Sequence, residues 1–302
     1  MDSTTEMFAD MAESIQNWFD HDFDTTDDSI VECGQPALAL LNSNPDQCLK
    51  LAYEKLNDAP YKDVPESYRR LYTDAALMKA KSFLTAESIA TSATTMHKTD
   101  PKGKNRVKDD EYLPEKELEV LTEVINILDK ALILTGAPRR RDAIFSILDI
   151  IETFLEYEIE NRELRPTKRT KLAEGALVDL EESFSTNFTQ PRLRFPIPKV
   201  HKMAFFDFEK MIQQAPKPMI ITGGMEHWPA LGERPWKDPK YLLRKTIGGR
   251  RLVPVEIGKS YTSTSWGQKL CSFKEFMDTH MLHKHGKVCS HSLHSPILIH
   301  LY

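Results

Sequence analysis

The feature that most constrains the fold is a helical spacing of apolar residues that runs through the first 160 residues and then stops. Four segments with this spacing begin near Pro45, Pro65, Pro114 and Pro138. Proline suits the first turn of a helix, where its missing N–H would have no partner. Apolar residues three and four positions apart line one face of a helix. The sequence therefore predicts four amphipathic helices that pack into an all-α domain.

The segment after Pro114 illustrates this pattern. Its apolar face consists of Leu118, Leu121, Ile125, Leu128 and Leu132. Gly136 follows, and glycine commonly adopts the left-handed conformation that ends a helix. Asn44 is predicted to cap the helix that begins at Pro45. The domain contains no evident catalytic motif, so it suits either a binding scaffold or a module that only forms a core.

A stretch with four prolines and mixed charge, residues 161–198, separates the helical region from the rest of the chain. Its composition is typical of a linker, with one short helix predicted over residues 172–180. Residues 165–171 form a basic cluster, Arg-Pro-Thr-Lys-Arg-Thr-Lys. Such a cluster can be a nuclear import signal or simply solvated charge, and both interpretations stay open.

Short strands and helices alternate after the linker. Met219, Ile220 and Ile221 form an apolar run closed by two glycines, which is typical of a strand. Pro254 suits the edge of a sheet, because proline cannot donate a ladder hydrogen bond. The expected elements are a helix over 201–214, a strand over 219–222, a helix over 241–247, a strand over 252–257 and a helix opened by Ser272 and Glu275. Together with the helical domain they predict an α+β protein.

Composition narrows the function classes. The net charge of -5 and the pI of about 6.1 give no sign of direct nucleic-acid binding. No apolar run approaches the roughly 20 residues that span a bilayer, and the N-terminus is acidic where a signal peptide would be basic. The 4 cysteines lack the spacing of a zinc or redox motif. We expect an intracellular protein with no membrane partner.

Several motifs in the second half resemble the Jumonji-C (JmjC) family of Fe(II) and 2-oxoglutarate oxygenases. They are Pro218 to Gly224, His227-Trp228-Pro229, Val253 to Gly258, Tyr261-Thr262 and Trp266. The resemblance implies a helical domain over 1–160, a linker over 161–198, and the first part of a JmjC or cupin-like double-stranded β-helix over 199–288. Residues 289–302 form a divergent, histidine-rich tail. The fold class is thus expected to be α+β with an incomplete double-stranded β-helix.

The family's chemistry is the hydroxylation of protein side chains or the demethylation of lysine with Fe(II) and 2-oxoglutarate. The resemblance implies a histone or another nuclear protein as partner, and a nuclear location, otherwise a cytoplasmic one. Tyr261 matches the tyrosine that can contact 2-oxoglutarate in the family, and packing at a strand end is its alternative role. The family's iron ligands are a His-x-Asp pair and a distant histidine. None of the 10 histidines here has Asp or Glu two residues later, so we assign no metal or catalytic residue.

The histidine-rich end of the chain, residues 280–302, admits two interpretations. Its histidines and one cysteine could bind zinc, copper or nickel; they are His280, His283, His285, His291, His294, His300 and Cys289. Alternatively the chain departs from the family pattern near Val288 through a frame change or a splice form. We expect a C-terminally truncated relative that is inactive and binds no cofactor. The alternatives are a non-catalytic helical interaction module and a product that does not fold.

Overall fold

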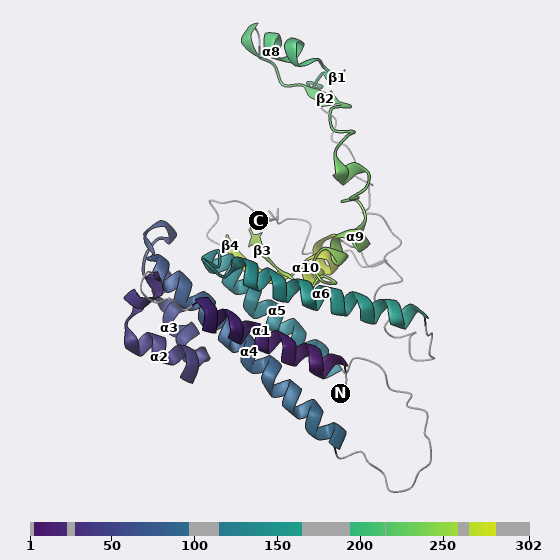
Figure 1. Ribbon diagram of the computed structural model, residues 1–302. Helices are drawn as coiled ribbons and strands as arrows, with labels where there is room; N and C mark the ends of the chain where they lie inside the picture. Colours follow the sequence, from purple (N-terminus) through teal and green to yellow (C-terminus); the bar gives the residue numbers. More distant parts are fainter. Residues whose placement is uncertain are drawn as a thin grey trace. The chain divides into compact units, whose positions relative to one another are not determined.

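The computed structural model describes residues 3–22, 28–96, 115–164, 194–214, 216–258 and 266–281. These residues are mostly helical and contain two small sheets (Figure 1). They divide into two compact units. The first unit contains the helices up to residue 164 together with Arg250–Pro254, and the second contains the described residues of 194–249 and 255–281. No helix in these ranges has the length and apolarity to cross a membrane.

Six α-helices form most of the first unit, where the spacing predicted four. They are α1 (Ser3–Asp22), α2 (Gln35–Ser43), α3 (Pro45–Asn57), α4 (Glu66–Met96), α5 (Glu115–Thr135) and α6 (Arg141–Leu164). Two 3-10 turns, η1 (Ser29–Cys33) and η2 (Tyr61–Asp63), join them. The expectation of four helices was wrong because it missed α1 and α2; α2 has a proline in its first turn but is only 9 residues long.

Helix α4 is the centre of this unit. It packs against α1, α3 and α5, and α5 packs against α6. The core is aliphatic, with side chains such as Leu71, Leu77, Leu121 and Ile125 fully buried. Burial of this apolar surface stabilises the unit, since each buried aliphatic side chain contributes about 1.5–3 kcal/mol.

The helix ends show how the predicted signals act. The side chain of Asn44 accepts a hydrogen bond from the backbone N–H of Gln47 at 3.1 Å, which confirms the predicted cap. Gly136 follows α5 with φ of +73°, the left-handed conformation expected there. Pro138 does not begin α6, because residues 138–140 form a turn and the helix starts at Arg141.

The second unit consists of short elements. In chain order they are β1 (Lys199–His201), α8 (Phe205–Gln214), β2 (Ile220–Thr222), η4 (Pro229–Leu231), α9 (Pro239–Arg244), β3 (Leu252–Ile257), β4 (Gly267–Ser272), α10 (Phe273–Phe276) and the π-helix η5 (Met277–Met281). Strand β3 begins in the first unit, at Leu252, and continues into the second. Strands β1 and β2 pair in parallel, with Val200 opposite Ile221, and β3 pairs with β4.

The structure confirms the predictions of strands at β2 and β3 and of a helix at α10. The Oγ of Ser272 accepts from the backbone N–H of Glu275 at 3.1 Å, as a capping residue should. The helix predicted over 201–214 starts later, at Phe205, because His201 belongs to β1. Strands β1 and β4 were not expected. The predicted helix over 172–180 and the tail over 289–302 lie outside the described residues. Each sheet among the described residues has two strands.

Candidate functional site

Tyr261, the predicted 2-oxoglutarate contact, lies outside the described residues, but the residues on both sides of its segment lie against each other. Gly258 follows β3 and Trp266 precedes β4. Gly258 has φ of +153°, and a Cβ at this position would lie 2.9 Å from the Cα of Trp266. Any larger residue would therefore push β3 and β4 apart, so this position requires glycine.

The Pro218 to Gly224 motif supplies β2 and the glycine turn after it. Nδ1 of His201 in β1 lies 3.2 Å from Oγ1 of Thr222 in β2. A Cβ on Gly223 would approach the His201 ring to 2.5 Å, and Gly223 has φ of +75°. The motif therefore makes a tight parallel strand pair whose histidine packs on a glycine. This pairing uses the His201 ring for structure.

Three histidines have described side chains, and they lie in separate surroundings. His201 contacts Thr222, and His280 lies near the Phe276 ring, with 5.4 Å between the ring centroids. His227 is exposed in the turn before η4. Within the described ranges, no three His, Cys, Asp or Glu side chains converge in a way that could hold a metal ion. An Fe(II) ion therefore fits no arrangement that the structure describes.

Two thiols of the helical unit are poor nucleophiles at neutral pH. Burial raises the pKa of Cys33 to about 11, although a hydrogen bond with Ser67 acts in the opposite direction and lowers it. Burial likewise raises the pKa of Cys48 to about 12. Since the thiolate is the reactive form of cysteine, neither residue has the microenvironment of a catalytic thiol.

Four charged side chains form a buried cluster inside the helical unit. The Arg70 guanidinium lies 2.5 Å from Oδ1 of Asp74 and 3.5 Å from Oδ2 of Asp28. Nε of Arg140 donates to Oδ1 of Asp74 at 3.2 Å. All four residues are at most 5% exposed. Because these residues come from the N-cap of η1, from α4 and from the turn before α6, the cluster joins parts of the chain that are distant in sequence.

A second buried carboxylate, Asp129 of α5, holds the start of β3. Its Oδ1 accepts from Nε of Arg251 at 2.7 Å, and its Oδ2 accepts from the backbone N–H of Leu252 at 2.7 Å. Burial raises the pKa of Asp129, and the Arg251 charge and the Leu252 N–H lower it. Sequence reasoning missed this residue. The available signal was an acidic residue one position after Leu128, on the apolar face of the helix.

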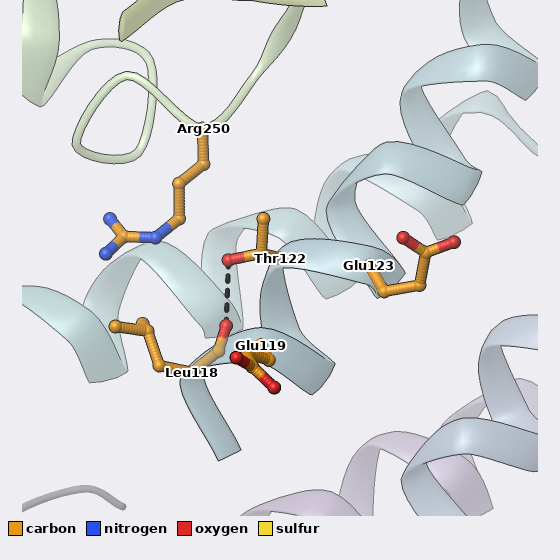
Figure 2. Close-up of a pocket in the computed structure, with 5 residues that line it drawn as sticks. All are labelled: Leu118, Glu119, Thr122, Glu123 and Arg250. Atoms are coloured by element: carbon orange, nitrogen blue, oxygen red, sulfur yellow. Dashed lines mark hydrogen bonds between the residues drawn. The ribbon is translucent and has the colours of Figure 1, made fainter. Parts of the chain in front are cut away.

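Beside this contact lies a shallow depression of about 310 Å³ on α5 (Figure 2). Leu118, Glu119, Thr122 and Glu123 line it from the helix, and Arg250 reaches over them from the segment before β3. The hydroxyl of Thr122 donates to the carbonyl of Leu118 at 2.7 Å, so it is already used within the helix. The depression brings two carboxylates and one guanidinium together without an enclosed cavity.

The chain is similar to JmjC-domain proteins, as its motifs predicted. Two of these relatives are named lysine-specific demethylase 8. The one from Danio rerio is 24% identical over 230 residues, which cover 76% of this chain and 47% of the relative. The one from Xenopus tropicalis is 25% identical over 295 residues, which cover 89% of this chain and 59% of the relative. The chain thus spans about half the length of these relatives.

A third relative is more similar in sequence to this chain, but over a shorter stretch. Jumonji C domain-containing protein 5 of Drosophila melanogaster is 35% identical over 81 residues, 27% of this chain and 19% of that protein. No family model matches the chain. No solved structure matches it either. The relationship to JmjC demethylases therefore rests on the curated relatives and is a relationship at the level of the family.

Proposed function

We propose that these 302 residues are a helical domain followed by the first part of a JmjC-type double-stranded β-helix, and that they do not carry out the oxygenase reaction by themselves. Support for the lineage comes from the relatives, which match 76% and 89% of the chain. The proposed inactivity rests on one observation: none of the 10 histidines is followed two residues later by Asp or Glu, as the family's iron site requires.

The family's chemistry requires two imidazoles and one carboxylate on one face of the iron, which leave positions open for 2-oxoglutarate and oxygen. His201 and His280 are engaged elsewhere within the second unit. Tyr261 could donate one hydrogen bond to a 2-oxoglutarate carboxylate, worth about 0.5–1.5 kcal/mol net. Millimolar affinity requires roughly 4 kcal/mol, so Tyr261 alone is insufficient. Iron and 2-oxoglutarate are thus cofactors of the family that we expect this chain not to bind.

The purified chain is expected to release no succinate above a no-enzyme control when 2-oxoglutarate, Fe(II), ascorbate and O₂ are supplied. A curated relative such as the Danio rerio lysine-specific demethylase 8, prepared in parallel, serves as the positive control. The Tyr261→Phe variant should be indistinguishable from wild type. Succinate release by the wild type that falls in Tyr261→Phe would contradict the proposal and would restore Tyr261 as a cofactor residue.

Protein recognition in the nucleus is the accompanying proposal, with a histone or another nuclear protein as partner. It rests on the relatives named as lysine demethylases and on the basic cluster at 165–171. The second candidate function is a non-catalytic interaction module formed by the helical unit. The observation that favours it is a closed helical core that also presents exposed aromatic side chains, among them Tyr53, Tyr61 and Tyr157.

A further inference from the structure

Asp129 contacts both the side chain and the backbone of consecutive residues at the start of β3. One oxygen accepts from Nε of Arg251 and the other from the N–H of Leu252, each at 2.7 Å. A side-chain contact alone could follow Arg251 to a new position. The backbone contact cannot follow in this way. A shift of β3 by one residue would move the Leu252 N–H away from Asp129 and would turn the side chains of β3 to the other face. The carboxylate therefore fixes the register of this strand.

The burial of Asp129 makes this contact necessary for the helical unit as well. Asp129 is 2% exposed, and it lies on the apolar side of α5 among Ile125, Leu128 and Leu132. A buried carboxylate without a cation or hydrogen-bond donors is costly. Arg251 and Leu252 supply both. Among the described residues, the hydrogen-bond partners of this buried charge thus come from the segment before β3 and from its first residue.

Charge complementarity extends over neighbouring residues. The described face of α5 carries Glu119 and Glu123, and the segment that crosses it begins with Arg250 and Arg251. Figure 2 shows the Arg250 side chain extending over the helix toward Leu118 and Thr122. Arg251 and Leu252 therefore bond to Asp129 of this acidic helix, and Arg250 lines the depression beside it.

We propose that the helices of the first unit support the start of β3, residues 252–254, with Asp129 as the anchoring residue. The surface formed by Asp129, Thr122 and Glu123 has Arg250–Pro254 as its partner. This role goes beyond the proposed function, because it applies whether or not iron is bound. The helices of the first unit are thus part of the folding environment of the start of β3, residues 252–254.

Hydrogen exchange on the full chain tests the anchor. In wild type the Leu252 amide should be protected, and Asp129→Ala should accelerate its exchange at least about 10-fold, since it loses its acceptor. Arg251→Ala should accelerate it less, because Asp129 still accepts from the backbone. Lys130→Ala, at an exposed charged residue next to Asp129 on the same helix, is the matched control and should leave Leu252 unchanged. Equal Leu252 exchange in wild type and Asp129→Ala, with α5 amides still protected, would overturn the proposal.

A double-mutant cycle covers the case in which Asp129→Ala does not fold. Asp129→Asn retains the shape and one acceptor, and it is combined with Arg251→Ala in urea unfolding of the full chain. The two changes should be non-additive, with a coupling of about threefold or more in the unfolding equilibrium constant. Additive effects would overturn the anchoring role. The succinate assay is independent of both measurements, so failure of the proposed function would leave them interpretable.

Discussion

Replacing Arg70 by alanine is expected to lower the free energy of unfolding by about 3–5 kcal/mol near pH 7.5. Arg70 is 1% exposed and contacts both Asp74, at 2.5 Å, and Asp28, at 3.5 Å. Its removal leaves the buried Asp74 with the guanidinium of Arg140 and the buried Asp28 with that of Arg139, which is 51% exposed. Water cannot solvate these carboxylates without opening the helical core, so most of the desolvation cost appears as lost stability.

The loss should shrink as the pH falls toward 5. Burial raises the pKa of Asp74 to about 6, although Arg70 and Arg140 lower it, so removal of Arg70 raises it further. A carboxyl whose pKa is raised on folding contributes stability that is present below its unfolded pKa of about 3.9 and is lost as the pH rises through its folded pKa. At pH 5 Asp74 is therefore largely neutral, and the missing cation matters less.

Urea unfolding followed by far-UV circular dichroism at both pH values measures this difference. Lys79→Ala is the matched control, because Lys79 also pairs with an aspartate, but with Asp46, which is 72% exposed. That change should cost less than about 1 kcal/mol and show little pH dependence. A loss of similar size in the two variants, or an Arg70→Ala loss that grows toward pH 5, would show that the cluster is not buried as described.

Replacing Phe8 by alanine is expected to lower the free energy of unfolding by about 3–5 kcal/mol. Phe8 is 1% exposed in α1, and α1 packs along α4 at the centre of the helical unit. The truncation leaves a cavity that a helix packed along its length cannot easily collapse. Thermal or urea unfolding measures the effect, with Glu13→Ala on the exposed side of α1 as control. A Phe8→Ala loss below about 1 kcal/mol would mean that α1 does not belong to the core.

Helix α1 also shows what the sequence could predict and what it could not. Helices α3 to α6 were predicted because a proline or a cap marks their start and their apolar residues repeat over several turns. In α1 the buried residues Phe8, Met11 and Ile15 have the same spacing, but neither proline nor glycine delimits them. Helix α2 spans Gln35–Ser43, too short for a repeated pattern to stand out.

The candidate site was less predictable than the fold, for a physical reason. Motifs identified the lineage and the β3 strand, since local residue types determine turns and strands. Asp74 and Asp129 could be noticed as acidic residues on apolar helix faces, but their partners could not. Asp129 meets Arg251 across 122 positions, and Asp74 meets Arg140 across 66. Such pairs follow from tertiary packing, which periodicity does not encode. The role of Tyr261 stays a prediction.

Anaerobic titration of the full chain with Fe(II), with and without 2-oxoglutarate, tests most directly the central claim that these residues hold no oxygenase iron site. The reason is that a two-histidine, one-carboxylate site binds the metal and the co-substrate together, so that each strengthens the binding of the other. We predict that 2-oxoglutarate leaves the iron-binding isotherm unchanged, whatever weak binding the histidine-rich tail contributes. One Fe(II) per chain, bound more tightly when 2-oxoglutarate is present, would contradict the claim.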